Sequence, residues 1–166
     1  METCMNAIAV VDENWGLGKD GKLLVHLSGD LRYFKGKTLG KTIIIGRETF
    51  EGMSGRILPG RDTVVLSRNP HFKADCPVCH SLEETFGFLR EKPGDELFVA
   101  GGEAVYRLFF PYCGRFYITK IFDAFEADRF FPNLDAEPER FTAFKSGEVM
   151  EENGVRYQFF EYVRTR

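Results

Sequence analysis

The sequence predicts an α/β fold, in which helices cover a mostly parallel sheet that ends in an antiparallel edge. Short apolar, β-branched runs alternate with amphipathic stretches bounded by Ser, Gly or Pro. The last two runs flank Asn153-Gly154, a dipeptide typical of a tight hairpin. The 166 residues, 43% of them hydrophobic, suffice for one sizeable core. We therefore expect a single domain that spans residues 1–166.

Local patterns predict the elements of the first half of the chain. The apolar run 7–11 is expected to be a buried strand, and the glycine-containing segment 12–22 a loop that acts as a mobile lid. Ser28 is expected to cap a helix, because its hydroxyl can accept a hydrogen bond from the first helical turn. The β-branched run 42–45 predicts a central strand, and residues 47–51 a short helix after it.

The second half continues the alternation. Further strands are expected at residues 63–66, 78–80, 97–100 and 115–122. A capping box at Ser81 opens a helix that runs to about Glu91, and another helix follows Gly102. Residues 141–149 and 155–163 form the two arms of the predicted hairpin.

Composition narrows the class of partner. The formal charge of -3, from 22 basic and 25 acidic residues, argues against a broad surface for nucleic acid or anionic membrane. It leaves room for a small anionic ligand, which needs only a few well-placed cations. No apolar run approaches the ~20 residues that span a bilayer, and the N-terminus lacks the pattern of a signal peptide. A cytoplasmic protein is expected.

The four cysteines are too few and too scattered for a disulfide scaffold. The stretch from Cys76 through Cys79 to His80 matches the pattern for c-type haem attachment, and its first four residues match a dithiol redox motif. Neither structural context is visible in the sequence. We favour a short strand that leads into the helix at Ser81, with a thiol redox protein as an alternative.

Three predicted strand ends carry features that bind anions. They are the pairs Gly46-Arg47, Ser67-Arg68 and Gly101-Gly102. In parallel sheets ligands bind beyond the carboxyl ends of the strands. Glycine permits close approach of the backbone, and arginine offers a fork that suits phosphate. Together they suggest a ligand with several phosphates, although no Gly-x-Gly-x-x-Gly motif follows the first strand.

The helix that begins at Ser28 carries a candidate binding carboxylate. Asp30 and Phe34 are four residues apart and so lie on one face. If that face lines a cleft, burial would raise the pKa of Asp30, which could bind a pair of nitrogens; otherwise Asp30 only favours the helix dipole. Arg61, after a Pro-Gly turn, suits a carboxylate or is a solvated turn residue. No nucleophile–base pair and no metal-ligand spacing is evident, so we expect no metal.

Several motifs taken in order resemble those of dihydrofolate reductase over nearly the whole chain. They include Gly-Leu-Gly-Lys at 16–19, Asp-Leu-Arg-Tyr-Phe-Lys at 30–35, Ile-Gly-Arg-Glu-Thr-Phe-Glu at 45–51, Leu-Pro-Gly-Arg at 58–61, Leu-Ser-Arg at 66–68, Val-Ala-Gly-Gly-Glu-Ala-Val-Tyr at 99–106 and Tyr-Ile-Thr at 117–119. The length resembles that of the stand-alone bacterial type. The resemblance implies an eight-stranded sheet with about four helices, and NADPH-dependent reduction of 7,8-dihydrofolate to tetrahydrofolate, which feeds one-carbon metabolism. It also implies a monomer that binds antifolates such as methotrexate or trimethoprim.

The resemblance assigns roles on the substrate side. Asp30 would be the catalytic carboxylate that bonds the pterin 2-amino group and N3, with the Thr119 hydroxyl nearby. The remaining substrate-binding residues would be Ile8 and Ala100 through their carbonyls, Leu31, Phe34 and Met53 as apolar walls, and Arg61 with Arg56 for the glutamate carboxylate.

The resemblance also assigns residues to NADPH. Val10, Leu17 and Gly18 would lie against the nicotinamide, and Gly101-Gly102 would form a cis pair beside the pyrophosphate. The adenosine half would be held by Arg47, Glu48, Thr49, Leu66, Ser67 and Arg68, with the arginines at the 2′-phosphate. The segment after the glycine pair, Glu103, Ala104, Val105 and Tyr106, would complete the cofactor site.

One departure from the family pattern concerns the residues ahead of Asp30. The family usually has Leu-Pro-Trp there, whereas this chain has Leu24-Val25, and a valine side chain cannot donate a hydrogen bond to water. His26 could substitute in part, or be a surface residue. The alternatives are a reductase of riboflavin biosynthesis, which has a similar fold and acts on a ribosylated pyrimidine, and a non-catalytic folate or nucleotide binder.

Overall fold

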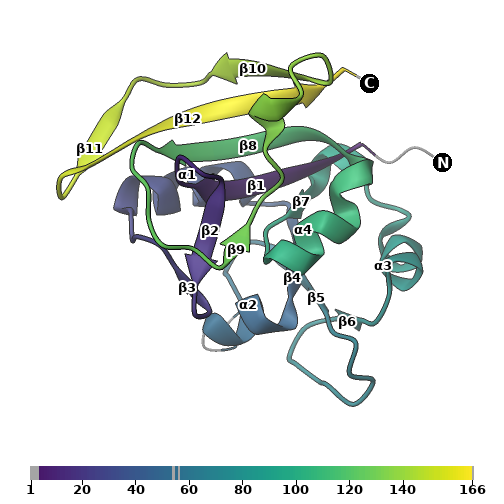
Figure 1. Cartoon of the computed structure of the whole chain (residues 1–166). Coiled ribbons are helices and arrows are strands. Elements are labelled where there is room, and N and C mark those ends of the chain that lie inside the picture. The colour runs from purple at the N-terminus through teal and green to yellow at the C-terminus, as the bar shows by residue number, and fades with distance from the viewer. Residues whose placement is uncertain (1–3, 54, 56, 166) are drawn as a thin grey trace.

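The computed structural model describes residues 4–53, 55 and 57–165. Its centre is a sheet of nine strands (Figure 1), eight of which follow one another in the order β10-β12-β8-β1-β7-β4-β5-β6. The strands are β1 Met5–Val11, β4 Thr42–Gly46, β5 Asp62–Leu66, β6 Val78–Cys79, β7 Leu97–Val99, β8 Cys113–Ile121, β10 Phe141–Lys145, β11 Met150–Glu152 and β12 Val155–Arg164. The described helices are α1 Ser28–Thr38, α2 Arg47–Gly52, α3 Leu82–Leu89 and α4 Glu103–Phe109, with short 3-10 turns η1 Gly94–Glu96, η2 Phe110–Tyr112 and η3 Leu134–Ala136.

The sheet confirms the predicted α/β class. The pairs from β8 through β1, β7, β4 and β5 to β6 are all parallel, whereas β12 is antiparallel to β8, β10 and β11. Asn153 and Gly154 have φ values of 52° and 81°, which a tight hairpin turn requires. The predicted hairpin is therefore present at the edge of the sheet.

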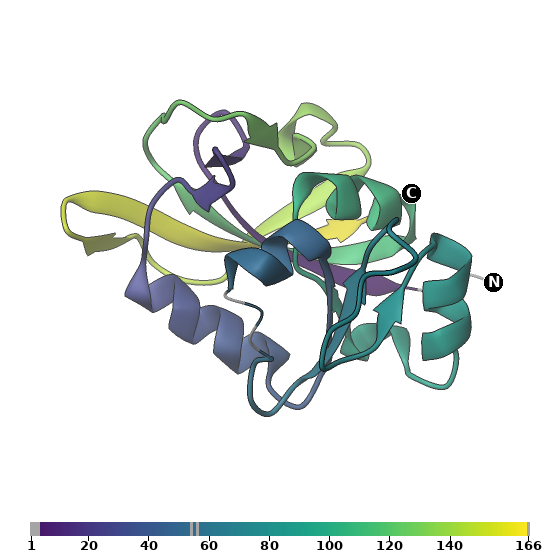
Figure 2. The ribbon, with the colours of Figure 1, turned by 90° about the horizontal axis from the view of Figure 1, so that it is seen from below.

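Alternating side chains of the central strands pack on opposite faces of the sheet. Ala7 and Ala9 of β1 join the large apolar cluster that includes Val105 and Phe109 of α4. Ile8, between them, joins a separate cluster on the other face, with Phe34 of α1. Figure 2 shows α1 and α4 on opposite sides of the sheet. The middle of β1 thus lies between these two helices.

Two predictions about strands and loops are wrong. Segment 12–22, expected to be a loop, contains β2 (Gly16–Lys19) and β3 (Lys22–Leu23), which form a second sheet with β9 (Arg129–Phe130). Strand β2 pairs with the neighbouring β3 across a turn at Asp20 and Gly21, which both have positive φ, and also with the distant β9. The Asp-Gly pair is a local hairpin signal that the loop prediction does not use, whereas the pairing with β9 has no local signal. The predicted arm 141–149 is shorter than expected: β10 ends at Lys145, the Ser146 N–H makes one more in-register bond to the Phe159 carbonyl, and the next strand, β11, begins only at Met150.

Smaller differences between prediction and structure concern the ends of helices and strands. The helix that opens at Ser81 stops at Leu89 rather than near Glu91, and its cap is as expected, since the Ser81 hydroxyl oxygen accepts the Glu84 N–H at 3.0 Å. The strand predicted at 115–122 begins two residues earlier, at Cys113. No helix in the described part of the chain is long and apolar enough to cross a membrane.

Candidate active site

A half-buried hydrogen bond joins α1 to the central sheet. The Thr119 hydroxyl on β8 donates to Oδ1 of Asp30 at 2.6 Å, across 89 residues of sequence. Thr119 is only 1% exposed. Burial raises the pKa of Asp30 above its ordinary value, and the Thr119 hydrogen bond opposes that rise in part. A carboxylate oxygen can accept more than one hydrogen bond, so both oxygens of Asp30 can also accept from a ligand with paired N–H donors.

Strand β1 lies beside the strand that carries Thr119, with Val10 paired in register with Thr119. The Tyr106 hydroxyl of α4 donates to the Ile8 carbonyl at 2.6 Å. A carbonyl oxygen has two lone pairs, so Ile8 can still accept a second hydrogen bond from a ligand. Ala100, which follows β7, is held by a 2.9 Å bond from its N–H to the Ile44 carbonyl, and its own side chain packs in the Ile8 cluster.

Apolar side chains border the same region. Phe34 packs in the cluster of Ile8, Ile43 and Phe98, and Met53, at the end of α2, packs in that of Ile45 and Phe50. Ala100 belongs to both clusters and so connects α1 with α2. Leu31 is 48% exposed, which places an apolar side chain on the solvent side of α1.

Arg61, proposed to bind a carboxylate, follows the turn at Pro59 and Gly60. The Arg61 Nε–H donates to the Pro59 carbonyl at 3.2 Å, and partial burial lowers the pKa of its guanidinium. The remaining guanidinium N–H groups stay available to a ligand. Arg56, predicted to lie close by, falls outside the described residues.

The glycine pairs at two predicted strand ends come together. The Gly46 N–H donates to the Gly101 carbonyl at 2.8 Å, and the peptide between Gly101 and Gly102 is cis, as the resemblance implied. A Cβ built on Gly46 would lie 3.0 Å from Val105, and one on Gly102 would lie 3.4 Å from the Thr49 hydroxyl. Side chains here would fill the space between the two strand ends, so glycine leaves an open backbone cradle.

The end of β5, the third of the predicted strand ends, is aligned with the end of β4. Gly46 of β4 pairs with Leu66 in register, which brings Ser67 and Arg68 to the same edge as Arg47. Ser67 is buried and its hydroxyl accepts the Asn69 N–H, whereas Arg68 is exposed. The Arg47 guanidinium lies 3.4 Å from the Glu51 carboxylate and over the Phe72 ring. Two arginines thus follow the ends of neighbouring parallel strands, and guanidinium groups suit a phosphate.

Other residues expected around the cofactor have different surroundings. Glu48 and Ala104 are exposed, and Val105 is buried in the main cluster. The Glu103 carboxylate accepts the Phe130 N–H of β9 at 2.6 Å and lies 3.5 Å from Arg107. Its visible contacts therefore tie α4 to the second sheet. The resemblance alone suggested a cofactor contact for Glu103.

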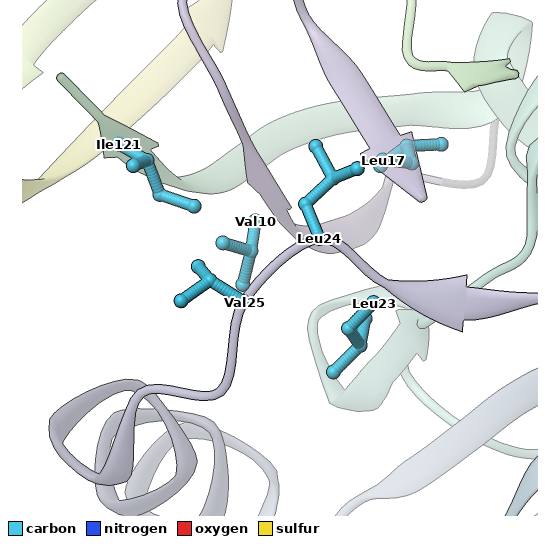
Figure 3. Close-up of a pocket in the computed structure, with 6 residues that line it drawn as sticks. All are labelled: Val10, Leu17, Leu23, Leu24, Val25 and Ile121. Carbon is cyan, nitrogen blue, oxygen red and sulfur yellow. The ribbon is translucent and has the colours of Figure 1, made fainter. Parts of the chain in front are cut away.

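Val25, which stands where the family pattern has tryptophan, lines a small cavity. The cavity is lined by Val10, Leu17, Leu23, Leu24, Val25 and Ile121, all of which are aliphatic (Figure 3). Gly18 is buried in the adjoining strand β2, and the Lys22 carbonyl lies 2.5 Å from where its Cβ would be. His26 is exposed, so it does not replace the missing indole in this cavity. This side of the site is apolar.

Sequence reasoning missed the group that caps α1. Ser28 is the first helical residue rather than the cap, because the chain enters helical geometry after Leu27, whose φ and ψ are extended. Both oxygens of the Glu152 carboxylate instead accept hydrogen bonds from this end of α1. Glu152 is 124 residues away from Ser28, so no local pattern could have identified it.

The cysteine motif has an ordinary structural role. Val78 and Cys79 form the short strand β6, as favoured from the sequence, and Cys79 is buried. Cys4, Cys76, Cys79 and Cys113 are all free, and burial raises the pKa of the Cys76 and Cys79 thiols, which makes them less reactive. No group of three or more metal-ligating side chains occurs in the described part of the chain.

Comparison with known proteins agrees with this geometry. The family model described as dihydrofolate reductase matches residues 4–164. The dihydrofolate reductase of Bacillus subtilis is 39% identical over 93% of this chain and 91% of its own, and that of Staphylococcus haemolyticus is 34% identical over 98% and 96%. A solved structure of the Enterococcus faecalis enzyme, complexed with NADP(H) and RAB-propyl, has a TM-score of 0.84 at 37% identity and covers 100% of this chain and 99% of its own. The chain belongs to the dihydrofolate reductase family.

Proposed function

We propose that this protein reduces 7,8-dihydrofolate to tetrahydrofolate with NADPH. The observations that carry the proposal are the half-buried Asp30–Thr119 hydrogen bond and the glycine cradle at Gly46, Gly101 and Gly102. A carboxylate with a raised pKa can bind the paired nitrogens of a pterin, and the cradle fits the backbone of a dinucleotide. The family of the chain supports both assignments.

On this proposal each residue has a defined task. Asp30 accepts hydrogen bonds from the 2-amino group and N3 of the pterin, and its charge stabilises the pterin as it gains a proton at N5. Thr119 fixes the orientation of that carboxylate. The Ile8 and Ala100 carbonyls, with Leu31, Phe34 and Met53, hold the ring, and Arg61 with Arg56 binds the glutamate carboxylate.

NADPH, when bound, supplies the hydride that pterin C6 accepts. On the protein side, Gly46, Gly101 and Gly102 admit the pyrophosphate, and Arg47 and Arg68 with Ser67 bind the 2′-phosphate. Val10, Leu17, Gly18 and Tyr106 border the nicotinamide and keep water away from it. The protein contributes mainly orientation and a preorganised field.

The test is a direct assay with purified protein, NADPH and dihydrofolate, followed through the loss of reduced nicotinamide absorbance. We expect turnover, with a strong preference for NADPH over NADH and with inhibition by methotrexate. Tight methotrexate binding without turnover would instead indicate a binding protein. Oxidation of NADPH only with a ribosylated pyrimidine would indicate the riboflavin pathway.

We also propose that the chain is one domain that works as a monomer in the cytoplasm. The first strand, β1, and the last, β12, both pair with β8, so the two ends of the chain share one sheet. Four free thiols suit a reducing compartment. Size-exclusion chromatography with light scattering tests the oligomeric state, and a dimer mass would contradict it.

A further inference from the structure

The first turn of α1 is held by a carboxylate from the other end of the chain. Leu27 occupies the N-cap position, and the described part of the helix provides no side-chain cap. Glu152 Oε2 accepts the Ser28 N–H at 2.8 Å and the Ser28 hydroxyl at 3.0 Å, and Oε1 accepts the Gly29 N–H at 3.2 Å. Glu152 therefore satisfies two backbone donors that have no partner inside the helix.

The strand after Glu152 contacts α1 twice more. A Cβ built on Gly29 would lie 2.1 Å from the Tyr157 hydroxyl oxygen, so β12 packs directly against the backbone of the first turn. One turn on, the rings of Tyr33 and Phe159 stack 3.9 Å apart at an interplanar angle of 7°. Figure 2 shows the β11–β12 hairpin beside the N-terminal end of α1. Together these contacts fix both the start and the tilt of the helix.

Asp30 lies between these contacts. It directly follows the two residues that Glu152 holds, and its carboxylate bonds to Thr119, which pairs in register with Phe159. The hairpin thus contacts the segments that carry both partners of the Asp30–Thr119 hydrogen bond. A shift of the first turn would move the Asp30 carboxylate relative to β8, and reaction rates are sensitive to displacements of about 1 Å.

We propose that Glu152 is a positioning residue for the reaction: by capping α1 from the C-terminal hairpin, it sets the place of the Asp30 carboxylate. The inference rests on the proposed function of Asp30. Glu152 hydrogen-bonds to Ser28 and Gly29, and it acts on Asp30 through these two residues.

The charges around this contact suit the arrangement. Hydrogen bonds from the Ser28 backbone hold the pKa of Glu152 below its ordinary value, so its carboxylate is ionised at neutral pH. His26 lies near enough to favour that ionised form, and Arg32 lies beside Tyr157. An anion at this end of α1 is also favoured by the helix dipole.

The central experiment compares Glu152→Ala with Glu151→Ala, an equal truncation of the exposed neighbour on β11. We expect Glu152→Ala to lower the hydride-transfer constant at neutral pH about tenfold, with little change in NADPH affinity. Glu151→Ala should leave both unchanged. Glu152→Gln should lose less, about threefold, because its amide oxygen still accepts one N–H.

A second variant separates positioning from charge. Proline suits the first helical position, where it needs no N–H partner, and Leu27 already has the extended geometry that a following proline demands. Ser28→Pro combined with Glu152→Ala should recover much of the lost rate. A pure charge effect of Glu152 on Asp30 would not recover, since the negative charge is still missing.

The pKa of Asp30 can also be measured without turnover, by carbon-13 NMR titration of its carboxyl group in the ligand-free protein. Loosening of the first turn should hydrate Asp30 and lower its pKa in Glu152→Ala, and the double variant should restore it. Equal rates and Asp30 titrations in Glu152→Ala and Glu151→Ala, or a double variant that recovers neither, would overturn the proposal. A wild-type protein without reductase turnover would overturn the proposed function instead, and the titration would still decide the role of Glu152.

Discussion

The two sides of the candidate site are assembled in different ways. On the cofactor side, three strand ends lie in neighbouring positions of one parallel sheet, and backbone pairing alone aligns Gly46 with Leu66 and with Gly101. On the substrate side, the decisive group lies on a helix. Asp30 is placed by Thr119, 89 residues away, and by the hairpin that carries Glu152.

This difference determines how each side responds to substitution. Backbone pairing in a central sheet tolerates changes of surface side chains, so a change on the cofactor side should affect one contact and little else. The place of Asp30 depends on a few side chains from distant strands. Substitution of any of them should therefore alter the rate through Asp30, and the effects should not be additive.

The most severe test of the substrate side is Asp30→Asn. We expect hydride transfer at neutral pH to fall about 10²–10³-fold, because the charge that stabilises the protonated pterin is lost. The rate should recover at low pH, where the substrate arrives protonated. Stopped-flow measurement of the hydride-transfer rate across pH tests this expectation. Glu83→Gln, on the exposed start of α3, is the control. A rate that does not change with pH in the variant would contradict this role for Asp30.

The same substitution should stabilise the fold at neutral pH. Because burial raises the pKa of Asp30, the folded protein binds the proton more tightly than the unfolded chain. Ionised Asp30 therefore costs stability at neutral pH, and the cost disappears as the pH falls through the raised pKa towards the ordinary value of 3.8. Thermal unfolding should show a higher Tm for Asp30→Asn than for wild type at pH 7, and no gain near pH 3.

Thr119→Val removes one hydroxyl with little change of shape. The Thr119 hydrogen bond lowers the pKa of Asp30, so its loss should raise that pKa further and move the pH profile upward. We expect the rate at neutral pH to fall about 10- to 100-fold, in line with ~1.5–3 kcal/mol for a hydrogen bond to a charged group. The direction is opposite to that expected for the Asp30 pKa in Glu152→Ala. If Thr119→Val and Glu152→Ala shifted the pKa of Asp30 in the same direction, the proposed roles of these two residues would be contradicted.

The contrast between the two sides also explains what the sequence could predict. The strands of the parallel sheet, the helices at Ser81 and Gly102, and the turn at Asn153-Gly154 follow from patterns within a few residues. The three glycine and arginine pairs follow from strand ends, so their meeting at one edge was a consequence of the fold class.

Features that depend on distant contacts could not be predicted in this way. Strand β2 pairs locally with β3, but its other partner, β9, lies more than a hundred residues later, and no local pattern points to it. Ser28 has the chemistry of a cap, but a carboxylate from β11 satisfies the helix end. The resemblance, rather than the spacing, placed Thr119 beside Asp30. Local patterns identify the residue types of a site, and tertiary contacts decide which of them act.

Gly29→Ala tests the packing that supports the substrate side. Its new Cβ would collide with the Tyr157 hydroxyl oxygen, so α1 and β12 must separate. We expect a loss of about 1–3 kcal/mol of unfolding free energy and a lower rate. Tyr157→Phe should relieve much of the clash, because the next atom, Cζ, lies at 3.2 Å. Gly36→Ala, on the open side of the same helix, is the matched control and should not destabilise the fold.

Arg68→Ala sharpens the comparison from the cofactor side, where the effect should be smallest and most local. We expect NADPH affinity to fall about tenfold, as for the loss of one charged hydrogen bond of ~1.5 kcal/mol, and NADH affinity to stay the same because NADH lacks the 2′-phosphate. Hydride transfer at saturating NADPH should not change, since strand register rather than Arg68 places the glycine cradle. Arg90→Ala on the exposed end of α3 is the control. If Arg68→Ala lowers the rate with bound cofactor, then the cofactor side is coupled to the chemistry as closely as the substrate side, and the distinction between them fails.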